Sequence, residues 1–195
     1  VLKIAFLFGI FGVSFSGPQA ILSAIGVAIL SGVVISGIPS GGMLGELMSV
    51  SIGIGYTLPF ECVASPGLDS HKLAEALNAY RLPGVKWRPI TYKPYYFTFS
   101  GQPLAGAQLY FTDPARAPLT AINLYAIEAL KQVGGVDAFA EAERVKRGFG
   151  MFDKVNGTDA TRKALQAGTP AADIVASWKA GEEAFRKVRR KYLLY

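Results

Sequence analysis

The chain has 195 residues, of which 20 are Lys or Arg and 14 are Asp or Glu, giving a formal net charge of +6. Its single cysteine and single histidine, Cys62 and His71, exclude an internal disulfide and a zinc site built from cysteine and histidine ligands. The charge is unevenly distributed, because Lys3 is the one charged side chain within residues 1–45. We therefore expect two regions, 1–45 and 46–195. Because the chain begins with Val, we also expect that upstream sequence is missing.

Residues 4–45 form an uncharged, mostly apolar run that is typical of membrane proteins. A single straight helix of this length would be about twice as long as the hydrocarbon layer is thick. Gly17 and Pro18 provide a break, and the piece that follows, Ala20 to Ile38, is long enough to span a bilayer. The sequence predicts one or two membrane helices, with residues 4–38 contacting lipid.

The segment SGVVISGIPSGGMLGELM, residues 31–48, combines small residues with a glycine-rich stretch. It resembles the late hairpin region of dicarboxylate/amino acid:cation symporters, and the resemblance covers about residues 5–48. It implies a transporter segment whose tip gates a substrate site. A secretory signal peptide is the alternative, because Lys3 precedes an apolar run, but a signal peptide does not explain the second apolar span.

Beyond residue 46 the sequence shows ordinary soluble periodicity. Asp69 or Ser70 can cap an amphipathic helix that ends near Leu82-Pro83-Gly84. Residues 85–99 and 107–112 are rich in aromatic and β-branched residues, which indicates strands joined by a turn. Prolines at positions 89 and 94 favour an edge strand.

The remaining sequence predicts helices. Residues 118–133 carry apolar side chains at helical spacing and stop at Gly134-Gly135. Residues 156–157 form a turn, Thr158 can cap a helix over 159–167, and a last helix opens at Pro170. Its apolar stripe consists of Ile174, Trp178, Phe185, Val188 and Tyr192. The order of strands and helices predicts an α+β domain with a small sheet and several helices.

Five basic side chains cluster near the C-terminal end: Arg186, Lys187, Arg189, Arg190 and Lys191. We expect no nucleic-acid partner, because cations at a helix C-terminus complement the helix dipole. A basic surface also suits an anionic cell-wall glycan or an anionic membrane. His71 and Cys62 are interpreted as a surface residue and a packed small side chain, respectively. We expect no metal and no cofactor.

The segment GIGYTLPFE, residues 53–61, combines flexible glycines, two hydroxyls and a carboxylate, as in a loop at a cleft. A glycosidase needs a carboxylic acid near the scissile bond, and hydroxyls beside it can hold a sugar. Glu61 could also cap or pair locally, and spacing alone favours that local role. The candidate cleft residues are Tyr56, Thr57, Pro59, Phe60 and Glu61; the catalytic residues stay unassigned.

Three motifs, VSIGIGYTLPFECVASPGLD, FDKVNGTDATRKALQAG and VRRKYLLY, occur in this order between residues 43 and 195. They resemble the C-terminal half of the bacterial exo-β-N-acetylmuramidase family, glycoside hydrolases of peptidoglycan recycling. The resemblance implies a two-domain enzyme whose N-terminal Rossmann-like domain carries most of the catalytic apparatus. It also implies cleft-lining roles for Thr57, Pro59, Phe60 and Glu61. Ile52 and Ile54 depart from the family pattern, which has charged residues there.

The sequence as a whole predicts a substrate-cleft domain of a peptidoglycan-acting glycosidase, inactive alone and bound to a muramyl glycan. The alternatives are a symporter fragment and a membrane-anchored glycan-binding module without chemistry. Because the two resemblances overlap at residues 42–51, we also expect a chimera, either a true fusion or an accidental join. The predicted location is membrane-associated, with the soluble domain outside the cytoplasm.

Overall fold

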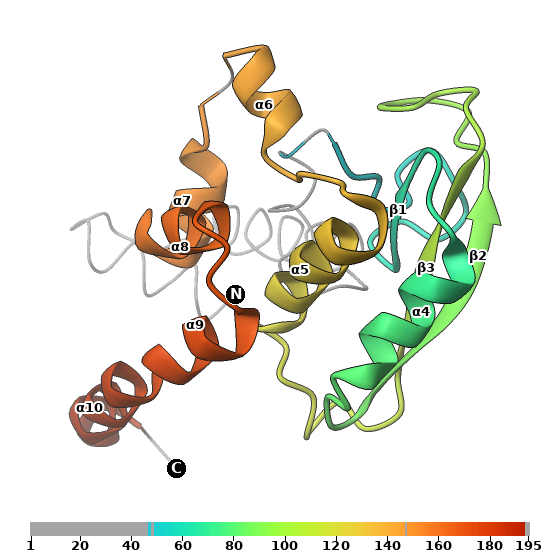
Figure 1. Ribbon diagram of the computed structural model, residues 1–195. Coiled ribbons are helices and arrows are strands. Elements are labelled where there is room, and N and C mark those ends of the chain that lie inside the picture. Colours follow the sequence, from blue (N-terminus) through green and yellow to red (C-terminus); the bar gives the residue numbers. More distant parts are fainter. Residues whose placement is uncertain (1–46, 48, 147, 194–195) are drawn as a thin grey trace, which may run out of the picture. The chain divides into compact units, whose positions relative to one another are not determined.

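A computed structural model describes residues 47, 49–146 and 148–193 (Figure 1). The predicted membrane helices over residues 4–38 lie outside these ranges, as does the symporter-like segment apart from Leu47. Within the described ranges, no helix has the length and apolar character needed to cross a bilayer. Membrane association and the chimera therefore stay predictions.

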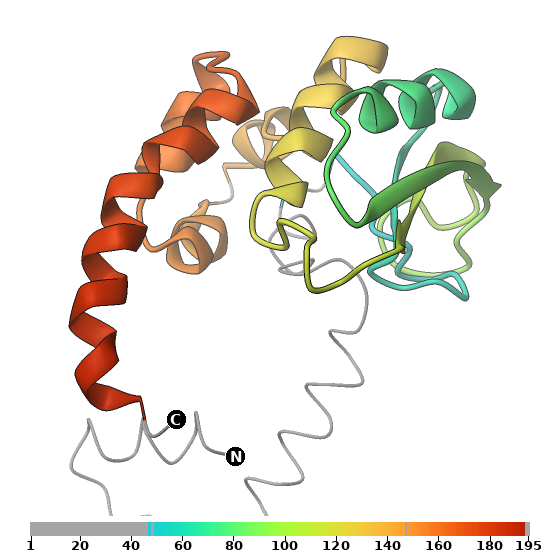
Figure 2. The ribbon, with the colours of Figure 1, turned by 90° about the horizontal axis from the view of Figure 1, so that it is seen from below.

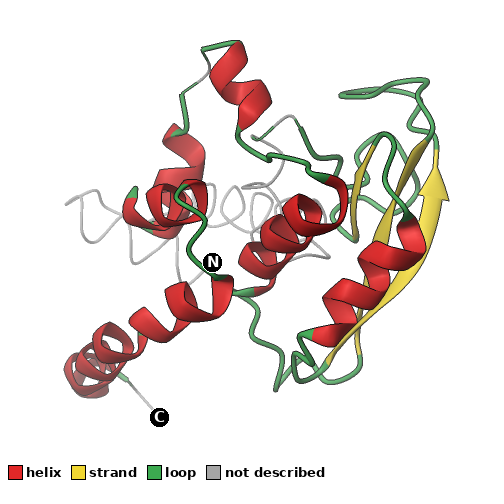
Figure 3. Cartoon of the chain, in the orientation of Figure 1, coloured by secondary structure: helices red, strands yellow, loops and turns green. Residues whose placement is uncertain are grey.

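A three-stranded antiparallel sheet forms within the described residues (Figure 3). Its strands are β1 (Cys62–Ser65), β2 (Val85–Tyr92) and β3 (Leu104–Phe111), in the order β1-β3-β2. β2 alternates buried and exposed residues at its start, as a strand with one covered face does. Pro89 lies in β2, at an edge of the sheet, which confirms the edge position predicted from the prolines.

α4 (Ser70–Ala79) packs on β2 and β3 at one face of the sheet, and α5 (Ile122–Gly134) packs on α4. Asp69 caps α4, because its carboxylate accepts hydrogen bonds from the backbone N–H groups of His71 and Lys72 at 3.0 and 3.1 Å. α5 ends at Gly135, whose φ of 62° is the left-handed value of a helix C-cap. Both helices were predicted, although α5 begins later than residue 118.

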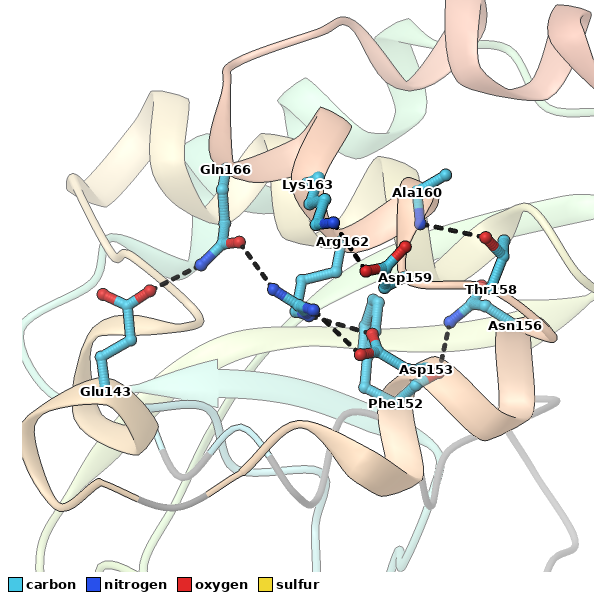
Figure 4. Close-up of polar contacts among 10 residues, drawn as sticks. All are labelled: Glu143, Phe152, Asp153, Asn156, Thr158, Asp159, Ala160, Arg162, Lys163 and Gln166. Atoms are coloured by element: carbon cyan, nitrogen blue, oxygen red, sulfur yellow. Dashed lines mark hydrogen bonds and ion pairs between the residues drawn. The ribbon is translucent and has the colours of Figure 1, made fainter.

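Three short helices follow: α6 (Ala140–Arg144), α7 (Gly150–Asn156) and α8 (Ala160–Gln166). Figure 4 shows how polar side chains connect them. The Arg162 guanidinium donates two parallel hydrogen bonds of 2.9 Å to the Asp153 carboxylate, joining α8 to α7. Gln166 accepts from Arg162 at 3.2 Å and donates to Glu143 at 2.6 Å, which extends the connection to α6. Such forked Arg–carboxylate pairs fix geometry as well as charge.

The last elements are α9 (Ala171–Ser177), α10 (Lys179–Arg189) and the 3-10 turn η1 (Arg190–Tyr192). Figure 2 shows α9 and α10 following one another as a nearly continuous helix, with Trp178 between them in helical conformation. The backbone N–H of Ala171 donates to Glu128 of α5 at 2.8 Å, which ties α9 to the domain. Ile174 is buried, whereas α10 has no buried residue.

Two apolar clusters lie on opposite faces of the sheet. The larger one joins the helix-side residues of the strands to α4, α5 and the later helices, reaching from Leu47 to Ile174. The smaller one consists of Cys62, Ala64, Tyr92 and Leu104, with partly buried residues of the loop over 53–61 packed against it. The loop proposed to line a cleft therefore covers part of the face that the helices leave open.

Candidate functional site

The loop over residues 53–61 is shaped by two glycines with positive φ, Gly53 at 81° and Gly55 at 84°. A Cβ on Gly53 would collide with the carbonyl oxygen of Leu58, and one on Gly55 with that of Tyr96. The Tyr95 N–H donates to the Gly55 carbonyl at 2.9 Å, so the loop is fixed against the segment that follows β2. Only glycine combines this φ with such close backbone approach.

Tyr56 packs inward from this loop onto Tyr92 of β2, with ring centroids 4.7 Å apart in a stacked arrangement. The Tyr92 hydroxyl donates to the buried Ser51 hydroxyl at 2.7 Å. Burial is the main reason that the pKa of Tyr92 is raised to about 12. Tyr56 thus contributes a half-buried ring that holds the loop on the sheet.

The other predicted cleft residues point in different directions. Thr57 and Pro59 are exposed. Phe60 adopts φ 65°, which is unusual for a residue with a side chain, and its ring packs against the larger apolar cluster. The structure therefore brings the backbone of these residues together, but it does not gather their side chains into one pocket. Their roles in a cleft stay predictions.

Glu61 is joined to three polar residues of the sheet, and we call this set the Glu61 network: Glu61, Arg88, Gln108 and Tyr110. Gln108 is only 2% exposed, and its side-chain nitrogen donates to the Glu61 carboxylate at 3.0 Å. The Gln108 side-chain oxygen accepts from Arg88 Nε at 2.8 Å and from the Tyr110 hydroxyl at 3.3 Å. Both ends of this buried amide are hydrogen-bonded, as burial requires.

The register of the sheet brings the network together. Gln108 lies in the central strand, opposite Cys62 of β1 on one side and Arg88 of β2 on the other. Glu61 directly precedes Cys62, and its carbonyl accepts from the Leu109 N–H at 2.8 Å. Because alternate residues of a strand share a face, Gln108 and Tyr110 point to the same side. That side faces away from α4.

The network is accessible at its outer edge. Arg88 and Tyr110 are exposed, and the guanidinium lies 4.8 Å from the Tyr110 ring centroid. A shallow pocket of ≈ 250 Å³ is lined by Glu61, Leu109, Tyr110 and Phe111. The Glu61 carboxylate and the Tyr110 phenol line this pocket, and the Arg88 guanidinium lies against the Tyr110 ring, so the network offers acceptors and donors suited to a polar, hydroxyl-rich or anionic ligand.

The network contains one carboxylate, Glu61. The adjacent Cys62 is buried, and burial together with the Glu61 charge raises the pKa of its thiol to about 12, so it is protonated and unreactive at neutral pH. The interpretation of Cys62 as a packed small residue is thereby confirmed, and His71 is exposed as predicted. Across the described ranges, no three His, Cys, Asp or Glu side chains are grouped to hold a metal ion.

The sequence did not identify Arg88, Gln108 and Tyr110 as site residues. A signal was present, because Gln108 interrupts a run of apolar residues in a predicted strand. A polar side chain in such a position needs a buried partner. Which partner it finds depends on strand register, and β1 was not predicted.

Comparison with known proteins shows the family to which the chain belongs. Residues 38–195 match the family described as exo-β-N-acetylmuramidase NamZ, C-terminal. The chain belongs to the NamZ family. It is 32% identical over 158 residues to the peptidoglycan β-N-acetylmuramidase NamZ of Bacillus subtilis (strain 168), covering 80% of this chain. The family resemblance expected from the three motifs is therefore confirmed.

A solved structure is also similar. The crystal structure of a DUF1343 family protein from Bacteroides fragilis NCTC 9343 has a TM-score of 0.72 and 34% sequence identity over 80% of this chain. The chain spans 36% of the length of the B. subtilis relative and 41% of that structure. In the relatives, the matched region is thus the smaller part of a longer polypeptide. Family membership supports a peptidoglycan-related, glycoside-hydrolase-like domain.

Proposed function

We propose that residues 46–195 form a substrate-cleft domain of a peptidoglycan-acting glycoside hydrolase, and that the Glu61 network binds a muramyl sugar. The observation that carries the proposal is the buried Gln108 amide, which fixes the Glu61 carboxylate beside Arg88 in a chain of the NamZ family. Because Gln108 already holds the Glu61 side chain in place, ligand binding costs little additional side-chain entropy.

The chemistry of the network fits a muramyl sugar. Muramic acid combines hydroxyl and amide groups with a carboxylate. The exposed Arg88 guanidinium has free donors beyond the Nε that Gln108 occupies, and a planar guanidinium pairs well with a carboxylate. Glu61 can accept hydrogen bonds from sugar hydroxyls. Arg88 would thus contact the carboxylate of muramic acid. Ile52 and Ile54, which replace the charged residues of the family pattern, cannot make this contact.

We further propose that the chain alone does not hydrolyse the glycan. Most glycosidases use two carboxyl groups that flank the scissile bond, and the network supplies one. The B. subtilis relative is much longer than this chain, and we infer that its additional sequence supplies the remaining catalytic groups. A glycan-binding module without chemistry makes the same prediction of no turnover.

The test measures binding and turnover separately. The 195-residue chain, in detergent, is titrated with the disaccharide of N-acetylmuramic acid and N-acetylglucosamine by calorimetry, and incubated with a chromogenic N-acetylmuramide. We expect saturable binding, a loss of about tenfold in affinity for Arg88→Ala, and no colour. Lys131→Ala, which removes one positive charge from the exposed side of α5, is the control and should bind normally.

Two results would contradict the proposal. If Arg88→Ala and Lys131→Ala bind the disaccharide equally well, the network is not the sugar site. If the chain releases colour and Glu61→Gln abolishes the release, the domain is catalytic without additional sequence, and the proposed division of labour is wrong.

A further inference from the structure

The apolar stripe of the last helix is covered over one half of its length and exposed over the other. Ile174 in α9 is 5% exposed and belongs to the larger apolar cluster, with Trp178 packed against that cluster. Further along the same stripe, Phe185, Val188 and Tyr192 are 63%, 54% and 71% exposed. Their spacing of three and four residues continues the spacing of Ile174 and Trp178. The packing surface thus extends beyond the domain that covers its first half.

α10 lacks the contacts that normally keep a short helix folded. It has 11 residues, none of them buried, and its principal contacts are with its chain neighbours α9 and η1 (Figure 2). α10 continues from the anchored α9, but most helical stability in proteins comes from packing of an apolar face, and α10 buries none of its own residues. A partner on the exposed part of the stripe would supply this packing.

The stripe has the form of a surface that packs in a protein groove. With about 100° per residue in α10, Phe185 and Val188 lie about 60° apart on the helix circumference, and Tyr192 follows in the 3-10 turn η1. A helix that lies in a membrane interface needs a broad apolar face, whereas a narrow seam is typical of packing between helices. Two cations, Arg189 and Lys191, lie nearest the seam on its two sides, whereas Lys187 lies on the opposite side of the helix. The complementary surface is therefore an apolar groove with carboxylates at its rim.

The size of the seam argues against a second copy of the chain. Three side chains cover far less than the roughly 800 Å² per partner that a stable interface buries. A groove within the same polypeptide needs less area, because linkage raises the effective concentration. In the B. subtilis relative the matched region makes up 36% of the length, so the relative has sequence that could present such a groove.

From these observations we infer that the seam formed by Phe185, Val188 and Tyr192 docks into an acid-rimmed apolar groove on the part of the NamZ polypeptide that precedes this region in the relatives. The contact would position this domain, and the Glu61 network with it, relative to the rest of the enzyme. The inference rests on family membership and on the exposed seam, and it does not depend on which ligand the network binds.

Hydrogen exchange of residues 182–193 tests the inference. It is measured in the 195-residue chain and in a chimera in which residues 38–195 replace the matching region of the B. subtilis relative. We expect rapid exchange in the chain and at least about tenfold slower exchange in the chimera. Phe185→Ser should remove this protection, whereas Lys187→Ser, on the other side of the helix, should retain it. Sugar binding, measured by titration, should be the same for both variants.

Several outcomes would overturn the inference. Slow exchange of residues 182–193 in the chain alone, at every concentration, would show that α10 needs no partner. Protection that appears only at high chain concentration would indicate a second copy, and protection conferred only by vesicles of anionic lipid would indicate a membrane surface. Equal exchange in the chain and in a cooperatively melting chimera would exclude the groove. If the chimera does not melt cooperatively, the same measurement is made on the intact B. subtilis relative and on its isolated C-terminal region that matches this chain. Equal exchange in those two proteins would also exclude the groove.

Discussion

At the scale of single residues, Cys62 couples the stability of the domain to pH. Burial, with the Glu61 charge, raises the pKa of its thiol from 9.0 to about 12. Below pH 9 the thiol is protonated in both the folded and the unfolded chain, and it does not affect stability. Above pH 9 only the unfolded chain ionises, so stability falls as the pH rises towards 12. Tyr92 adds to this fall above pH 10, because its pKa is also raised to about 12.

We expect Cys62 to lower the free energy of unfolding by about 1 kcal/mol between pH 8 and pH 10. Urea denaturation of the chain and of Cys62→Ala at pH 8, 9 and 10 measures this pH-dependent loss of stability. The variant loses some packing at every pH, but its stability should change less between pH 8 and pH 10. Identical pH dependence in both proteins would show that the thiol ionises equally well when folded.

The residues of the site differ in how far the sequence predicted them. Glu61 was identified, because a carboxylate in a glycine-rich loop is recognisable without a structure. Gln108 was not, because its importance arises from the register that places it between Cys62 and Arg88. Tyr56 was assigned to a cleft on its hydroxyl, whereas its ring stacks on Tyr92, a contact between residues distant in sequence.

At the scale of secondary structure elements, one side chain of α4 pairs with the free edge of β2. The Asn78 amide donates to the Trp87 carbonyl at 2.7 Å and accepts from the Trp87 N–H at 3.0 Å. β2 is an edge strand, so these backbone groups have no neighbouring strand on that side. Asn78 therefore supplies the two hydrogen bonds that a neighbouring strand would make, and it fixes the helix on the sheet.

We expect Asn78→Ala to destabilise the domain by about 1–3 kcal/mol, because a partly buried donor and acceptor lose their partners. Asn78→Asp should also destabilise it, since a carboxylate cannot donate to the Trp87 carbonyl. Glu75→Ala, at an exposed position of the same helix, is the matched control and should have little effect in urea denaturation. Equal midpoints for all three variants would mean that the two hydrogen bonds do not stabilise the edge.

Elements with strong local signals were predicted, including the short α8, whereas β1, α6 and α7 were not. α4 had a capping residue and regular apolar spacing, and Asp69 proved to be its cap. β1 is buried on both faces over four residues, so it shows no alternation to recognise. α6 and α7 have five and seven residues and begin without a side-chain cap, so neither periodicity nor a capping residue marks them in the sequence. Their helical form depends on contacts such as the Arg162–Asp153 pair, which joins separate helices.

At the scale of the whole molecule, the larger apolar cluster connects the sheet to the later helices. It contains Leu47, strand residues such as Trp87, and residues of the helical part such as Phe152 and Ile174. Phe152 is fully buried, and its ring centroid lies 5.4 Å from that of Phe139. The sequence predicted residues 46–195 as a region separate from residues 1–45. A shared core implies in addition that the sheet and the helices unfold together.

We therefore expect a chain cut to residues 46–195 to unfold in a single transition, followed equally by far-ultraviolet circular dichroism and by fluorescence of Trp87, measured in a Trp178→Phe background so that Trp87 is the one tryptophan. Phe152→Ala should lower the midpoint for both signals together, with a loss of about 3–5 kcal/mol, because it leaves a cavity in the shared core. Met151→Ala, at an exposed neighbouring position, controls for changes in helix propensity and should shift the midpoint little. If Phe152→Ala moves the helical signal while the Trp87 transition stays in place, the helices form a separate folding unit, and the cluster does not couple them to the sheet.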